Sequence, residues 1–198
     1  MFSDDIRDIG DSTVTNLFES FSMVEDLSIW LSTIMCFVQD VVPRVLPTPL
    51  IHLKYLYVGH MNFAFKDGLP ILLFLIRSSP NLEKLQIQIF DDLWVTESRE
   101  RPSTLESLEC YSDIWLERLN VLEISYFSNE KMELDLELDF MTFILAKSPV
   151  LKKVKICLWR DINEDDELHI SRTLLSSQRA SPMTEIIVER DNFDYGAV

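Results

Sequence analysis

Glycine is scarce in this 198-residue chain, and the few glycines stand far apart. There are four of them, Gly10, Gly59, Gly68 and Gly196. Loops that cradle phosphate groups and turns that expose a catalytic serine need closely spaced glycines, because only glycine lets the backbone approach a ligand or bend so sharply. The sequence therefore lacks the marks of a nucleotide-binding loop and of a serine-hydrolase nucleophile.

Cysteines and long apolar runs are also in short supply. Cys36, Cys110 and Cys157 are odd in number, widely separated and without a C-x-x-C pair, which is typical of reduced thiols in an intracellular compartment. No stretch approaches the roughly 18 apolar residues of a membrane span, and the acidic start lacks the features of a secretory signal. We therefore expect a soluble, intracellular protein of the cytoplasm, the nucleus or both.

Basic residues are the third shortage. The chain has 18 Lys and Arg against 33 Asp and Glu, which gives a formal net charge of −15 and a pI near 4.5. A protein that works mainly on nucleic acid or on an anionic membrane needs a basic face, so this balance argues against both as partners. The hydrophobic share of 47% suits one globular domain with a core.

Two groups of residues resemble metal sites, and both fail in detail. Residues 161–165 match the D-x-N-x-D start of a calcium-binding loop, but Asp166 stands where the loop needs glycine and Arg172 where it needs glutamate. The histidines show neither i, i+4 pairing nor a neighbouring cysteine at ligand spacing: His52, His60 and His169. We expect no metal ion and no cofactor. Carboxylate pairs carry no information about catalysis in so acidic a chain, and nothing marks a nucleophile, so we predict no enzyme.

One pattern of apolar residues recurs along the chain. From residue 71 the sequence reads ILLFLIRSSPNLEKLQIQIF, a helix candidate, a Ser-Pro stop and an alternating run typical of a strand. The strand core has the form apolar, two residues, apolar, one residue, apolar. Six copies begin at Val24, Leu53, Leu82, Leu119, Leu151 and Met183. A leucine-rich repeat has this core at a period of about 20 to 29 residues, so the spacings of 29 to 37 residues here lie at or beyond its long end.

This repeat predicts the fold. One unit cannot bury its own apolar side, whereas six stacked units make a parallel sheet on a concave face and helices on the convex face. We therefore predict an α/β leucine-rich-repeat solenoid in the form of a short horseshoe arc. A short helix is expected over 16–23, and longer helices over 69–78, 136–147 and 168–178. Core packing is predicted for Phe74, Phe90, Met141 and Phe143.

Side chains that point out of the strands would line the concave face, where a partner would bind. The strand register gives these candidates: Tyr55, Tyr57, Lys84, Gln86, Gln88, Glu123, Ser125, Lys153, Lys155, Glu185 and Glu189. Two tyrosines beside mixed charges suit a protein partner, since aromatic anchors carry much interface energy. A solvated sheet face without a partner is an equal alternative, and Lys153 and Lys155 would then only protect the sheet from aggregation.

The repeats resemble those of a known plant family. Residues 79–82 and 148–151 begin an SP-x-L-x-x-L-x-I signature that is similar to that of the F-box/FBD/LRR-repeat proteins. Residues 119–127, 137–156 and 172–188 resemble an FBD domain. The resemblance implies the following division: leucine-rich repeats at 14–114 with a variable loop at 91–116, then an FBD region at 115–189. An acidic, frayed N-terminus is expected at 1–13 and a tail at 190–198.

Members of that family carry an F-box that docks on a Skp-type adaptor in a cullin ubiquitin ligase, while the repeats receive a substrate. No F-box pattern precedes the first repeat here. The resemblance therefore implies a non-enzymatic protein-interaction module, a substrate-recognition unit of F-box/LRR type without its own F-box. The alternative is a substrate adaptor of a cullin-type E3 ubiquitin ligase whose F-box lies outside this sequence, with the Skp-type adaptor and cullin as partners. A hydrolase or transferase with an unmarked site is a third, weaker alternative.

Overall fold

The structure is a computed structural model, and it describes residues 17–18, 20–36, 42, 45–63, 65, 67–90, 108, 110–126, 134–160 and 162–190. Six strands lie in these residues: β1 (Asp26–Trp30), β2 (Tyr55–Met61), β3 (Lys84–Ile89), β4 (Val121–Tyr126), β5 (Lys153–Leu158) and β6 (Glu185–Arg190). The described helices are α2 (Leu31–Met35), α3 (Gly68–Arg77), α5 (Leu134–Lys147) and α6 (Glu164–Ser176). The predicted N-terminus at 1–13, most of the variable loop (91–107) and the tail after residue 190 lie outside the described residues.

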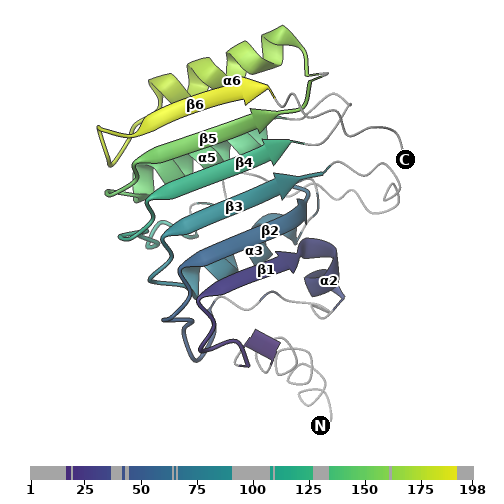
Figure 1. Ribbon diagram of the computed structural model, residues 1–198, viewed down its shortest axis with the longest axis vertical. Coiled ribbons are helices and arrows are strands. Elements are labelled where there is room, and N and C mark those ends of the chain that lie inside the picture. The colour runs from purple at the N-terminus through teal and green to yellow at the C-terminus, as the bar shows by residue number, and fades with distance from the viewer. Residues whose placement is uncertain are drawn as a thin grey trace.

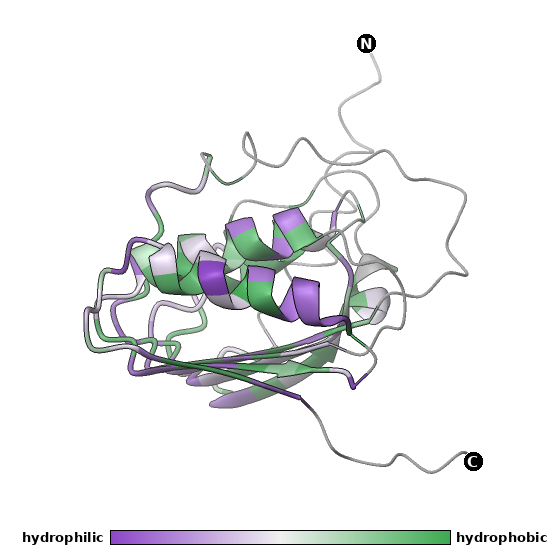
Figure 2. Cartoon of the chain, turned by 90° about the horizontal axis from the view of Figure 1, so that it is seen from above, coloured by the Kyte–Doolittle hydropathy of each residue, from purple (hydrophilic) through white to green (hydrophobic). Residues whose placement is uncertain are grey.

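The six strands form one parallel sheet in which neighbours in sequence are neighbours in space, in the order β1-β2-β3-β4-β5-β6. In Figure 1 the strands follow one another from β1 to β6, with α3 and α5 behind the sheet and α6 beside β6. Figure 2, which shows the sheet edge-on, places these helices in one layer on a single face. The predicted α/β class and the parallel sheet are confirmed.

The same tight turn precedes each strand. Its last residue donates a backbone hydrogen bond to the carbonyl three residues earlier, at 3.0 to 3.4 Å: Val24 to Phe21, Leu53 to Leu50, Leu82 to Ser79, Leu119 to Leu116, Leu151 to Ser148 and Thr184 to Ser181. Proline suits the second position of such a turn because its φ is already near the required value. Pro80, Pro149 and Pro182 occupy that position, so the Ser-Pro pairs mark where each turn toward a strand begins.

The sixth turn differs from the sequence pattern by one residue. The pattern begins its sixth copy at Met183, but Met183 is 87% exposed, and the buried residue of this turn is Thr184, which is 6% exposed. The chain has one residue fewer between this turn and its strand than in the unit before, so the buried position moves along by one residue. The Thr184 hydroxyl donates to the carbonyl of Leu151 at 2.9 Å, which satisfies a polar group that would otherwise be costly to bury.

The helices agree with the prediction in the middle of the chain and differ at both ends. Observed α3 and α5 begin and end within two residues of the predicted bounds. Helix α6 begins at Glu164, four residues early, because the Asn163 side chain accepts a hydrogen bond from the Asp166 N–H at 2.8 Å and caps the helix. Its acidic first turn is favourable beside the positive end of the helix dipole. Of the short helix predicted at 16–23, only Leu17 and Phe18 are helical in the described residues, and α2 was not predicted.

The core lies between the sheet and the helix layer. Leu56, Leu85, Leu122 and Val154 occupy equivalent places in four neighbouring strands and are fully buried. Phe74 and Met141 are buried as predicted, and Phe143 packs against the core with part of its surface exposed. Among the described residues, no helix combines the length and the apolar character needed to cross a membrane.

Candidate interaction face

The sheet face opposite the helices carries the predicted partner-binding side chains, and we call it the open face. Strand register arranges its side chains in three rows that cross the sheet. The first row contains Asp26, Tyr55, Lys84, Val121, Lys153 and Glu185. The second contains Ser28, Tyr57, Gln86, Glu123, Lys155 and Ile187. The third contains Trp30 beside Gly59, then Gln88, Ser125, Cys157 and Glu189. All eleven predicted residues thus lie on this face, and their role in binding stays a prediction.

Tyrosine–glutamine hydrogen bonds join β2 to β3 across the open face. The Tyr55 hydroxyl donates to the amide oxygen of Gln86 at 2.9 Å, and the Tyr57 hydroxyl donates to that of Gln88 at 2.7 Å. Each amide oxygen is thereby engaged, so the NH₂ group of the same amide is the part that can donate to a partner. Burial raises the pKa of both tyrosines, which keeps the phenols neutral donors.

Ion pairs join other strands. Lys84 contacts Glu123 at 2.8 Å, and Lys155 contacts Glu189 at 2.8 Å. The hydrogen bond in the second pair raises the pKa of Lys155 and lowers the pKa of Glu189. Both pairs are partly exposed to water, so they contribute little to stability and mainly fix the positions of the side chains. Among the described residues, no ion pair joins Lys153 to Glu185, although the two lie opposite each other.

An aromatic cluster at the carboxyl ends of β1 to β3 was missed by the sequence analysis. It consists of Trp30, Tyr57, His60 and Phe90. The Trp30 and His60 rings meet edge to face with centroids 4.3 Å apart, and His60 stacks on Phe90 at 5.0 Å. The prediction that Phe90 packs in the core is wrong, because Phe90 continues the outward positions of β3 two residues beyond Gln88. Extending the strand register by that one step would have placed Phe90 on the open face.

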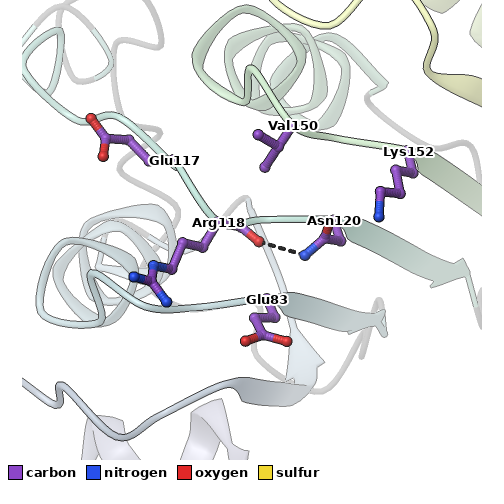
Figure 3. Close-up of a pocket in the computed structure, with 6 residues that line it drawn as sticks. All are labelled: Glu83, Glu117, Arg118, Asn120, Val150 and Lys152. Atoms are coloured by element: carbon purple, nitrogen blue, oxygen red, sulfur yellow. Dashed lines mark hydrogen bonds between the residues drawn. The ribbon is translucent and has the colours of Figure 1, made fainter.

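A shallow groove of about 430 Å³ lies at the opposite edge of the sheet, where the strands begin. It is lined by Glu83, Glu117, Arg118, Asn120, Val150 and Lys152. Figure 3 shows the Asn120 amide turned toward the carbonyl of Arg118, to which it donates at 2.8 Å. None of the lining residues is buried, so the groove lacks the desolvated acid or base typical of an enzyme site.

The described residues also contain no group of three or more His, Cys, Asp or Glu placed to hold a metal ion. Cys157, the cysteine on the open face, has its pKa raised by burial, so its thiol stays protonated. A protonated thiol is a poor nucleophile and a poor metal ligand.

Tyr126, the last residue of β4, is buried on the helix side of the sheet. Its hydroxyl has no hydrogen-bond partner among the described residues. Burial, with a smaller contribution from the Glu137 carboxylate, raises the pKa of Tyr126 well above the usual 10.0. Folding therefore strips this hydroxyl of water without a replacement hydrogen bond, which costs free energy.

Replacing Tyr126 by phenylalanine is expected to raise the free energy of unfolding by about 1 kcal/mol at neutral pH, because the uncompensated hydroxyl is removed. Above the usual tyrosine pKa, the unfolded side chain loses its proton while the folded one keeps it. Stability of the unchanged protein then falls by about 1.4 kcal/mol per pH unit from this group, and Tyr126→Phe abolishes that contribution. Urea unfolding at neutral and alkaline pH measures both effects. Tyr55→Phe, which loses a hydrogen bond, should show no gain at neutral pH, and identical alkaline slopes for Tyr126→Phe and the unchanged protein would contradict the prediction.

In the described residues, the fold is of the α/β class, with one parallel sheet in sequential order and one sheet face that no described helix covers. Among curated proteins, the chain is 29% identical over 155 residues to the F-box/FBD/LRR-repeat protein At1g13570 of Arabidopsis thaliana, which supports a relation at the level of that family. The match covers 75% of this chain and 34% of that protein, so the chain spans about a third of its relative's length. No known family model and no solved structure match the chain.

Proposed function

We propose that the chain is a leucine-rich-repeat solenoid that works as a non-enzymatic protein-interaction module, a substrate-recognition unit of F-box/LRR type that holds its partner on the open face. The observation that carries this proposal is the regular repetition of one unit along the described residues. Six turns of one kind lead into six strands whose order in the sheet is their order in the sequence. A solenoid is defined by units that contact only their neighbours in this way.

A second repeated feature supports the solenoid. The residue before each of the first five strands offers its carbonyl oxygen to the next unit. Four of these oxygens accept two N–H groups each, at 2.8 to 3.2 Å: those of Glu25, Lys54, Glu83 and Asn120. The carbonyl of Lys152 accepts from Glu185 at 2.9 Å. The backbone N–H groups at the start of these strands thereby find acceptors in the neighbouring unit, so each unit fixes the position of the next.

The open face suits a protein partner for two reasons. Its side chains are held by cross-strand hydrogen bonds and ion pairs, so little side-chain entropy is lost when a partner binds. It also presents aromatic rings beside polar groups, a combination that is enriched at protein interfaces.

The name and length of the Arabidopsis relative favour a second candidate. That protein is named as an F-box protein, and this chain spans about a third of it. A chain of this kind joined to an F-box outside the present sequence would act as a substrate adaptor of a cullin-type E3 ubiquitin ligase. The binding face would be the same, and only the consequence of binding would differ.

The test is affinity capture with the full chain from its native cells, followed by mass spectrometry. A double variant, Tyr57→Ala with Lys84→Ala, removes two side chains of the open face. The matched control, Leu168→Ala with Arg172→Ala, changes two exposed residues on α6. We expect a defined protein to be captured by the unchanged chain and by the control, and to be lost with the open-face variant while its thermal unfolding is unaltered.

A partner retained by the open-face variant would overturn the proposal. Recovery of a Skp-type adaptor and cullin together with that partner would favour the ligase candidate. Capture of chaperones alone would argue against both.

A further inference from the structure

The backbone beside the aromatic cluster is irregular. The register between β2 and β3 shifts between Val58 and Met61, which marks a β-bulge, and His60 there has a φ of 52°. This left-handed conformation is costly for a residue other than glycine, and bulges of this kind re-aim side chains at functional places. Here the bulge places the exposed His60 ring between Trp30 and Phe90.

Gly59 lets the rings come together. A Cβ atom at this position would lie 3.1 Å from Cε1 of Tyr57 and 3.2 Å from Cε3 of Trp30. An added Cβ would therefore make the two rings move aside by a few tenths of an ångström. The bare backbone at Gly59 thus allows the present close approach of Tyr57 and Trp30.

The chain places its own cations over several other aromatic rings. Lys147 lies over Trp115 at 4.9 Å, Arg160 over Trp159 at 5.8 Å, Lys84 over Tyr55 at 5.5 Å and Arg77 over Tyr111 at 5.9 Å. Trp30 differs: it is 46% exposed, and none of the described residues places a cation over its ring. Tryptophan has the aromatic ring that attracts cations most strongly, so the Trp30 ring is available to a cation from another molecule.

The charge of the chain favours the same ligand. Asp26 lies on the open face at the opposite end of β1 from Trp30, about 13 Å along the strand, and no ion pair engages it within the described part of the chain. The whole chain carries a net charge of −15, which attracts a basic partner and repels an acidic one.

We infer that the aromatic cluster is the docking point for an arginine side chain of a basic, extended partner segment that lies on the open face. The guanidinium stacks on the exposed ring of Trp30, with His60 and Phe90 fixing the orientation of that ring. Arginine suits this place better than lysine, because its planar and weakly hydrated group stacks on aromatic faces. This inference rests on the proposed function and names the chemical class of the partner.

The test uses the full chain and three synthetic peptides that differ only at the same set of positions. The first carries arginine at regular positions, the second has citrulline there, and the third has glutamate. Citrulline keeps the planar shape of arginine and removes its charge. Calorimetric titration is expected to show that the arginine peptide binds about tenfold more tightly than the citrulline peptide, with the glutamate peptide weakest.

Three variants show whether that preference belongs to the cluster. Trp30→Ala should abolish the difference between arginine and citrulline, and Trp30→Phe should keep part of it because an aromatic face remains. The matched control, Trp115→Ala, removes an exposed tryptophan that already has Lys147 over its ring, and it should change nothing. Thermal unfolding of each variant shows that the fold is retained.

The inference is overturned if the arginine peptide does not bind, if the citrulline peptide binds equally well, or if Trp30→Ala keeps the preference. Such a failure is distinct from failure of the proposed function. A partner captured through Tyr57 and Lys84 without any arginine preference would leave the protein-binding role intact, whereas the absence of any captured partner counts against that role itself.

Discussion

Leu122→Ala is expected to lower the free energy of unfolding by about 3 kcal/mol, the size typical of a leucine removed from a tightly packed interior. Leu122 lies in β4, which has strands on both sides, and its side chain is fully buried against the helix layer. The surrounding strands are held by backbone hydrogen bonds to both neighbours, so they cannot collapse into the space that the missing atoms leave. Urea unfolding followed by circular dichroism measures the change.

Glu123→Ala is the matched control, since it changes the adjacent residue on the opposite face. It removes the ion pair with Lys84, which is partly exposed, and should cost less than about 1 kcal/mol. A large effect of Glu123→Ala with a small effect of Leu122→Ala would mean that the strand faces are reversed. Every residue assigned to the open face would then point into the core, because a shift of one residue exchanges the two faces of a strand.

The strand cores could be predicted from the sequence because the same local rule repeats. The cores of β3, β4 and β5, such as Leu85 and Ile87 with Gln86 between them, alternate between a buried and a half-exposed side. Six copies of that alternation predict a parallel sheet, and the sheet fixes which residues share a face. The placement of Tyr55 and Glu185 on one row therefore required no knowledge of distant contacts.

The aromatic cluster could not be predicted in the same way, because it depends on a break in the rule. The bulge at His60 follows from how β2 and β3 fit together after Val58, which no local pattern in either strand reveals. Phe90 was assigned to the core because its spacing was interpreted as core-facing, whereas its contact with His60 exists only when the two strands are side by side.

Single-residue differences between the units also could not be predicted from the sequence. Thr184 replaces an apolar residue with a hydroxyl that finds a carbonyl of the neighbouring unit, and only the folded structure shows that carbonyl. Helix α6 began earlier than apolar spacing suggested, because Asn163 caps it through a side-chain hydrogen bond. Periodicity reports which residues are buried, and it does not report which polar groups satisfy one another.

Gly68→Ala is expected to lower the free energy of unfolding by about 2 kcal/mol, although alanine normally stabilises a helix relative to glycine by up to about 1 kcal/mol. Gly68 is the first residue of α3, and a Cβ atom there would overlap the carbonyl oxygen of Asn62. That oxygen belongs to the backbone just after β2, so relief requires α3 or the end of β2 to move. The site is buried, and the overlap therefore decides the sign of the change.

Gly59→Ala is the control that separates overlap with backbone from overlap with side chains. The atoms nearest to its added Cβ belong to the Tyr57 and Trp30 rings, and both rings can turn into solvent. Its cost in stability should stay below about 1 kcal/mol, the centre of the range for single substitutions, because the added Cβ meets only side-chain atoms that can move aside. Thermal and urea unfolding of the two variants give the comparison. If Gly68→Ala is neutral or stabilising, α3 is not held against the backbone after β2, and the contact between the helix layer and the sheet is looser than the structure shows.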